Sequence, residues 1–169
     1  MLAIVLAYVW RRPWLVPLVV VADVAAGGTA ALLRALIGRP RPPLTFREIT
    51  TLVSLPNDPS FPSGHAATSF ACALCLAWAS RRVLVRSALL GLALAIAISR
   101  LYVGVHYPLD VAGGALLGVI VAAVLLACLR AAARRRGLDL FARFQQPGRD
   151  DPERRDQCDP KPDRATVGR

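Results

Sequence analysis

The two histidines of the chain both lie in short polar motifs at the ends of apolar segments. His65 ends the sequence PSGH, and His106 stands four residues before Asp110. A neutral imidazole can act as a nucleophile, and a protonated one can act as a general acid. The pair therefore fits phosphoryl transfer through a covalent intermediate. The alternative, that each histidine is a buried and hydrogen-bonded side chain, is weakened because no histidine lies elsewhere in the chain.

Three arginines lie close to the ends of the same segments: Arg34, Arg41 and Arg100. Arginine keeps its charge in proteins, and its planar fork of N–H groups matches the oxygens of a phosphate in pairs. Arg39 is a candidate for a fourth phosphate-binding arginine. Three separated stretches thus each bring arginine or histidine to the end of an apolar segment, which indicates a phosphate site.

Ser63 and Gly64 precede a segment, residues 65–79, that is expected to be helical. The free N–H groups of a first helical turn bind anions, and the helix dipole adds to this effect. Glycine also lets the backbone approach a ligand closely. We interpret both residues as phosphate-binding; the alternative is an ordinary helix start with Ser63 as its N-cap.

The spacing of His106 and Asp110 suits a nucleophile and its partner. Pro108 lies between them at a place where a helix can begin. One helical turn then separates the carboxylate from the imidazole, so Asp110 can accept a hydrogen bond from one ring nitrogen. The other ring nitrogen keeps its lone pair for attack, and His65 is left to protonate the leaving alkoxide.

Together these residues resemble the three signature motifs of the type-2 phosphatidate phosphatase superfamily, in their order and approximate separation. The superfamily includes bacterial lipid phosphatases, undecaprenyl-diphosphate phosphatases, some acid phosphatases and the vanadium haloperoxidases. The resemblance implies that His106 is the nucleophile, Asp110 its partner and His65 the acid. It also implies a set of phosphate-binding residues, namely Arg34, Arg41, Ser63, Gly64 and Arg100.

One position departs from the pattern of that superfamily, because its first motif usually opens with lysine and here the residue is Arg34. Positive charge is kept, but a compact ammonium is replaced by a larger fork. The resemblance implies a mechanism without a metal or cofactor. The sequence contains no convincing cluster of metal ligands, and Cys72 and Cys75, inside an apolar segment, are interpreted as packing residues.

The composition predicts an all-α, integral-membrane helical bundle. The chain is 55% hydrophobic, with a mean hydropathy of +0.47. Four segments, residues 13–37, 65–79, 83–99 and 108–129, are apolar and long enough to cross or nearly cross a bilayer. Residues 1–10 are too short to span alone and are interpreted as the end of an earlier helix, so the bundle resembles the superfamily core shortened at its N-terminus. Gly114 and Gly118 are expected to allow close helix packing within it.

The arginines outside the motifs predict which side of the membrane the site faces. They cluster at residues 11–12, 81–86 and 130–136, which alternating spans bring to one side. The positive-inside rule names that side as cytoplasmic. The candidate catalytic residues then lie on the extracytoplasmic face of the cell membrane. The net charge of +10 follows from this topology and an anionic ligand, and no nucleic-acid motif accompanies it.

Two regions are expected: a membrane-embedded domain at residues 1–136 and a cytoplasmic, largely disordered tail at 137–169. Between the first two motifs, Thr45 and Glu48 fit a capping box that predicts a short amphipathic helix through Val53. The alternative there is a surface loop with one helical turn. Asp23, inside the first span and on the same helical face as Arg34, is expected to face protein or water.

The sequence thus predicts a membrane lipid phosphatase that hydrolyses a phosphomonoester or a diphosphate through a phosphohistidine. Its partners are the lipid substrate and the bilayer. A polyprenyl diphosphate or polyprenyl phosphosugar is the favoured substrate, followed by phosphatidate or phosphatidylglycerol phosphate. Three alternatives remain: a lipid phosphotransferase with the same intermediate, a vanadate-dependent haloperoxidase, and a non-catalytic membrane scaffold.

Overall fold

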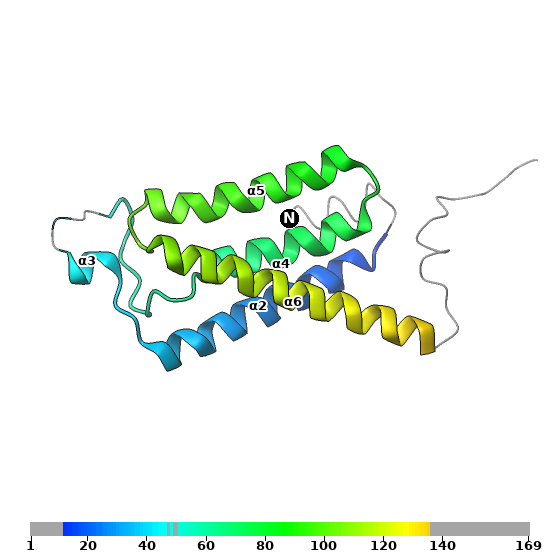
Figure 1. The fold of residues 1–169 in the computed structure, drawn as a ribbon, viewed down its shortest axis with the longest axis horizontal. Helices are drawn as coiled ribbons and strands as arrows, with labels where there is room; N and C mark the ends of the chain where they lie inside the picture. The colour runs from blue at the N-terminus through cyan, green and yellow to red at the C-terminus, as the bar shows by residue number, and fades with distance from the viewer. Residues whose placement is uncertain (1–11, 47, 49–50, 136–169) are drawn as a thin grey trace, which may run out of the picture. The chain divides into compact units, whose positions relative to one another are not determined.

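The described part of the chain is built from helices alone. The structure, a computed structural model, describes residues 12–46, 48 and 51–135. Its helices are α2 (Leu15–Ile37), α3 (Pro42–Thr45), α4 (Gly64–Ala79), α5 (Val83–Tyr102) and α6 (Pro108–Arg135) (Figure 1). Each of the four apolar segments forms a helix, which confirms the all-helical prediction. The expected end of an earlier helix at residues 1–10 and the expected tail at 137–169 lie outside the described residues.

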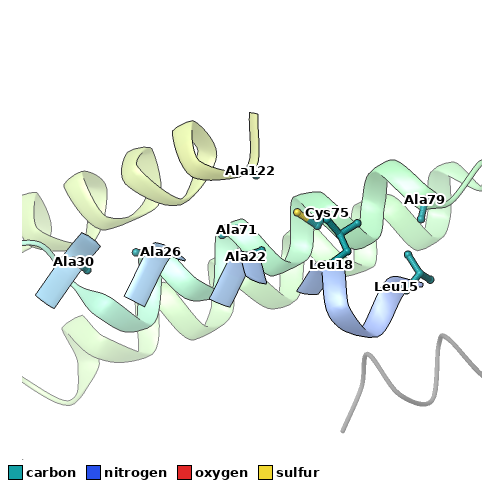
Figure 2. Close-up of a cluster of buried hydrophobic side chains, with 10 residues drawn as sticks. Leu15, Leu18, Ala22, Ala26, Ala30, Ala71, Cys75, Ala79 and Ala122 are labelled. Atoms are coloured by element: carbon teal, nitrogen blue, oxygen red, sulfur yellow. The ribbon is translucent and has the colours of Figure 1, made fainter. Parts of the chain in front are cut away.

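Helix α4 packs between α2 and α5 through small side chains. Of its buried residues, Ala71 lies beside Ala22 of α2 and Cys75 lies beside Leu18 (Figure 2). A second cluster joins α4 to Ala93 of α5. Small side chains let two helix axes approach closely, which suits packing in a membrane, where apolar area alone gives little preference for helix contact over lipid.

Glycines on α6 bring that helix against the backbone of α4. A Cβ atom added at Gly114 would collide with the carbonyl oxygen of Ser63, and one added at Gly118 would collide with that of Ala67. The expectation that these glycines serve packing inside the bundle is confirmed. Their contact fixes the start of α6, just after His106, beside the start of α4, which carries His65.

Three of the helical segments are long and apolar enough to cross a membrane: Leu15–Thr45, Val83–Tyr102 and Pro108–Arg135. The fourth, Gly64–Ala79, is apolar but only 16 residues long. Large apolar side chains such as Leu32, Leu84 and Val124 are exposed on the helix surfaces, as expected for a bundle that contacts lipid. Asp23, which was expected to face protein or water, is exposed, and the Cys72 thiol lies 4.0 Å from its carboxylate.

The predicted amphipathic helix over residues 46–53 does not form in the residues that the structure describes there. The helical turn α3 begins earlier, at Pro42, and ends at Thr45, with Phe46 in an extended conformation. Proline at the first two helical positions fixes φ for a helix start and needs no N–H partner, so the turn begins at the prolines. The alternative interpretation, a surface loop with one helical turn, fits the residues that are described there, 42–46, 48 and 51–53.

Three of the described arginines outside the motifs, Arg12, Arg86 and Arg130, contact the C-terminal end of α4, whereas His65 lies at its N-terminal end. Arg12 donates to the carbonyl of Ala79, and Arg86 donates to that of Ser80. Arg130 lies over the ring of Trp78. These basic residues therefore lie at the end of α4 away from the motif residues, and we predict that this end faces the cytoplasm.

We expect cysteine at Ser54 to react with an impermeant maleimide in intact cells, and cysteine at Arg81 to react only after permeabilisation. Both positions are exposed, and they lie at opposite ends of the bundle, so the positive-inside rule places Arg81 in the cytoplasm. Labelling is read by a gel shift in a background whose own cysteines are replaced by alanine. Reaction at Arg81→Cys but not at Ser54→Cys in intact cells would reverse the topology.

Candidate active site

Six of the eight residues predicted for the site line a single cavity. The cavity has a volume of about 370 Å³ and lies where the C-terminal ends of α2 and α5 meet the first turn of α4. The six are Arg34, Arg41, Gly64, His65, Arg100 and His106. The other two, Ser63 and Asp110, are fully buried. The three motifs, spread over 77 positions of the sequence from 34 to 110, thus converge on one place.

His106 lies in the loop between α5 and α6, and its two ring nitrogens have different neighbours. The Nη1 atom of Arg41 is 3.4 Å from Nε2, and Oδ2 of Asp110 is 3.7 Å from Nδ1. Arginine can only donate, so Nε2 must be the acceptor and Nδ1 carries the hydrogen of the neutral ring. Nδ1 has no hydrogen-bond partner at the present distance, although it faces Asp110. The lone pair available for attack is therefore that of Nε2, on the side of the arginines.

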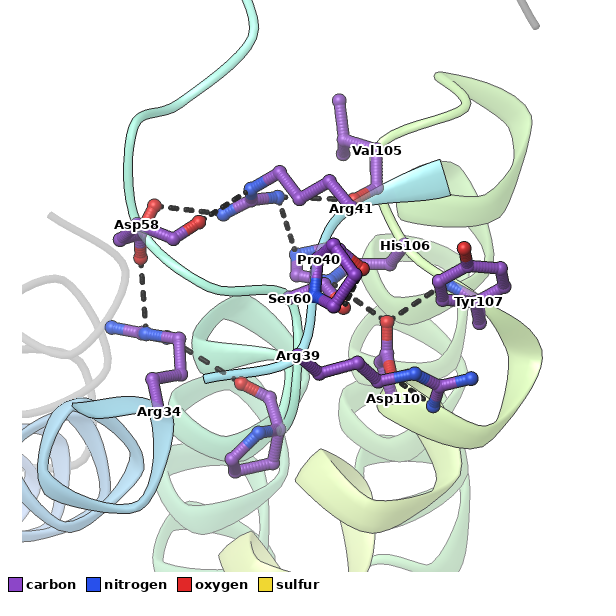
Figure 3. A network of polar contacts seen from close by, with 11 residues as sticks. Arg34, Arg39, Pro40, Arg41, Asp58, Ser60, Val105, His106, Tyr107 and Asp110 are labelled. Atoms are coloured by element: carbon purple, nitrogen blue, oxygen red, sulfur yellow. Dashed lines mark hydrogen bonds and ion pairs between the residues drawn. The ribbon is translucent and has the colours of Figure 1, made fainter. Parts of the chain in front are cut away.

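Asp110 is held from several directions. Its Oδ1 accepts from Nη1 of Arg39 at 2.8 Å, and its Oδ2 accepts from the backbone N–H of Tyr107 at 2.9 Å (Figure 3). Its backbone carbonyl accepts from the N–H of Ser63 at 2.9 Å, which ties the second motif to the third. A carboxylate fixed in this way can orient the His106 imidazole next to it.

Arg39 has a different role from the one expected. It was a candidate phosphate ligand, but its guanidinium pairs with Asp110 and stacks 4.2 Å from the centre of the Tyr107 ring. The planar guanidinium suits both contacts at once. Arg39 therefore supports the carboxylate next to His106 instead of lining the cavity.

Arg34 and Arg41 converge on a carboxylate that the sequence analysis did not include in the site. Nε of Arg34 lies 3.0 Å from Oδ2 of Asp58, and Nη2 of Arg41 lies 2.8 Å from Oδ1 (Figure 3). Partial burial would raise the pKa of Asp58, but the hydrogen bond and charge of Arg41 and the charge of Arg34 lower it below the usual value. The carboxylate is therefore ionised at neutral pH. The only sequence signal for it was an acidic residue between two basic motifs.

Gly64 and Ser63 differ in how they meet their predicted roles. A Cβ atom added at Gly64 would lie 2.6 Å from Nη1 of Arg34, so glycine leaves the room that the guanidinium occupies. Ser63 is the residue before α4, but its side chain makes no capping bond, and its buried Oγ has no partner. Neither the N-cap interpretation nor a direct place in the cavity lining describes its hydroxyl.

The pKa of His106 lies below its usual value of 6.5. Burial of the ring is the main cause, because it disfavours the charged form, and the positive charge of Arg41 acts in the same direction. Asp110 has the opposite effect and offsets it only in part. The neutral form of the His106 ring therefore predominates at neutral pH.

We expect the His106 imidazole to titrate below pH 6.5 in an NMR experiment on protein labelled at histidine, because burial and Arg41 lower its pKa. The chain has only two histidines, so His65→Gln leaves one signal to assign. A titration midpoint above 6.5 would contradict this assignment of the electrostatics.

Comparison with known proteins agrees with the three motifs. The sequence model of the PAP2 superfamily matches residues 13–134. Decaprenylphosphoryl-5-phosphoribose phosphatase of Mycobacterium tuberculosis is 37% identical over 120 residues, which cover 68% of this chain and 60% of that protein. Lipid A 4'-phosphatase of Bacteroides thetaiotaomicron is 37% identical over 93 residues, which cover 52% of this chain and 41% of that protein. The chain thus spans about 60% or less of the length of these relatives.

The fold has a counterpart of known structure. The crystal structure of LpxE from Aquifex aeolicus superposes with a TM-score of 0.65 at 29% identity, and the match covers 73% of both chains. The sequence match extends over more than half of the present chain and includes every motif residue. The chain therefore belongs to the PAP2 superfamily, as its motifs predict, and is a multi-pass membrane protein.

Proposed function

We propose that this protein is a lipid phosphatase that hydrolyses a phosphomonoester or diphosphate through a phosphohistidine on His106. The observation that carries the proposal is the position of Nε2 of His106, which faces Arg41 while Nδ1 faces a buried carboxylate. The negative charge on the phosphate oxygens repels the lone pair of the attacking nitrogen. Attack on the phosphorus atom therefore needs positive charge nearby to offset this repulsion. Arg34, Arg41 and Arg100 supply that charge from three different segments.

In the first step the lone pair of Nε2 attacks phosphorus, and the bond from phosphorus to the leaving oxygen breaks. The arginine forks bind the nonbridging oxygens, whose charge is redistributed in the transition state. His65, in the same cavity, gives its proton to the leaving alkoxide. As positive charge grows on the His106 ring, Asp110 stabilises it and keeps the ring oriented.

In the second step water attacks the phosphohistidine. His65, neutral after the first step, accepts the proton from water, and the bond between nitrogen and phosphorus breaks. The products are inorganic phosphate and a neutral His106. Each group returns to its starting protonation state, so the cycle needs no further reactant.

The position of the cavity suits a substrate with a lipid tail. The cavity lies at the ends of helices whose outer surfaces are apolar, so a bound head group can keep its tail in the bilayer. One relative is named for a phosphoribose on a decaprenylphosphoryl lipid, and another is named as a phosphatase of lipid A. We therefore place a polyprenyl phosphosugar first among substrates and a polyprenyl diphosphate second, ahead of phosphatidate and phosphatidylglycerol phosphate.

The test is phosphate release by the purified full chain from a panel of these lipids. Orthovanadate, which adopts a trigonal-bipyramidal form like the transferring phosphoryl group, is expected to inhibit competitively, and EDTA is expected to leave the rate unchanged. Thr29→Ala, on an exposed face of α2, serves as the matched control for purification and detergent. Loss of activity in EDTA that a divalent ion restores would contradict the mechanism, and no release from any lipid would contradict the function.

A further inference from the structure

Asp58 occupies a position between the two arginines that are expected to hold the phosphate. Its two carboxylate oxygens each pair with a different guanidinium, at 3.0 Å for Arg34 and 2.8 Å for Arg41. It lines the same cavity as His65 and His106, and 46% of its side chain is exposed there. Two oxygens of one anion that bridge two arginine forks are the arrangement that a phosphate group would make at this place.

The hydrogen bonds of Arg41 leave little room for a second anion. Its Nε donates to the backbone carbonyl of Asp58, and its Nη1 donates to Val105 and faces His106. Its Nη2 donates to the Asp58 carboxylate. Of the five N–H groups of an arginine, four are thereby directed at protein atoms. A phosphate that takes both forks must displace the Asp58 side chain.

We propose that Asp58 is an internal anion that competes with the substrate phosphate for Arg34 and Arg41 and thereby sets which anions can occupy the site. This inference rests on the proposed phosphate site. Bilayer phosphodiesters surround the cavity at high local concentration, each with a single charge and two free oxygens. The Asp58 carboxylate stays paired with the two arginines when only such weak ligands are present. The phosphomonoester or diphosphate of a substrate displaces the carboxylate.

The effect has a simple quantitative form. When a ligand binds only the fraction of molecules in which the arginines are released, its apparent Kd rises by the inverse of that fraction. The factor is the same for every anion that requires the release. The apparent Kd of abundant weak anions is thereby raised above their concentration at the membrane, so they do not occupy the site. A substrate with high intrinsic affinity still binds.

The deciding experiment measures binding to the full chain in detergent by isothermal titration calorimetry. Two probes are used at a pH of about 8: inorganic phosphate, mostly a dianion there, and dimethyl phosphate, a monoanion. Asp58→Asn is expected to tighten the Kd of both probes by the same factor, about threefold to tenfold, since the two ion pairs are partly exposed. The matched control is Asn57→Asp/Asp58→Asn, which keeps the net charge but moves the carboxylate by one residue. It is expected to bind both probes as Asp58→Asn does.

Three outcomes would overturn the inference. Weaker binding in Asp58→Asn would mean that the carboxylate positions the arginines for phosphate. A larger gain for the dianion than for the monoanion would indicate a long-range field instead of displacement, and wild-type binding in the double variant would indicate the same. Failure of the proposed function can be told apart from failure of this inference. Phosphate binding without any lipid turnover would contradict the proposed function alone. No phosphate binding to either the wild type or Asp58→Asn would contradict both.

Discussion

Alanine in place of His106 is expected to abolish phosphate release from every substrate, whatever its leaving group. The phosphohistidine cannot form without Nε2, and removing a nucleophile from a preorganised site costs about 10⁴-fold or more in kcat. The measurement is turnover of both a lipid phosphate and p-nitrophenyl phosphate by the purified variant. Its thermal unfolding, compared with the wild type, establishes that the loss is chemical.

A trapping experiment makes the same prediction sharper. After brief reaction with a radiolabelled substrate, wild-type protein should carry a phosphoryl group that acid removes and base does not, and His106→Ala should carry none. Retained turnover of p-nitrophenyl phosphate by His106→Ala would rule out the nucleophile assigned here.

Alanine in place of His65 is expected to lower the hydrolysis of an alkyl phosphate far more than that of p-nitrophenyl phosphate. A general acid contributes typically about 10²–10⁴-fold, and its help is needed least when the leaving group is already a stable anion. The loss should therefore approach that range for the lipid and be small for the nitrophenyl ester, as read from kcat/KM for the two substrates.

The control for His65→Ala is a second leaving group of intermediate stability, phenyl phosphate, whose loss should lie between the other two. An equal loss for all three substrates, in a variant that unfolds at the wild-type temperature, would remove His65 from the role of general acid.

Much of this fold could be predicted because its signals are local. The four long helices follow from apolar runs, and α2 ends at Ile37, just before Gly38, whose φ of 66° suits glycine. The glycine spacing on α6 likewise predicts close packing. The turn at Pro42 was misplaced because two signals competed, a capping box at Thr45 and a proline pair upstream, and the proline pair prevailed.

The site was predictable to the extent that its motifs have fixed chemistry. His65, His106 and three arginines line one cavity, as expected, but the only partner of these residues that was foreseen is Asp110, next to His106. Arg39 was assigned another role and Asp58 was missed, because their roles depend on contacts across 71 and 17 positions of the chain, which no local spacing encodes. A motif indicates which side chains form the site, whereas the tertiary contacts determine which charged residues pair with those side chains.

The shortness of α4 bears on where in the membrane the chemistry takes place. A helix of 16 residues is about 24 Å long, less than the roughly 30 Å of hydrocarbon in a typical bilayer. Because Gly114 and Gly118 lock α6 against it, α4 cannot slide outward to make up the difference. If its other end sits at the far interface, the cavity lies several ångströms beneath the plane of the lipid head groups. The phosphate of the substrate then moves inward to reach the cavity, and the lipid tail stays in the bilayer. The distance that it moves depends on the thickness of the membrane, so turnover should depend on that thickness as well.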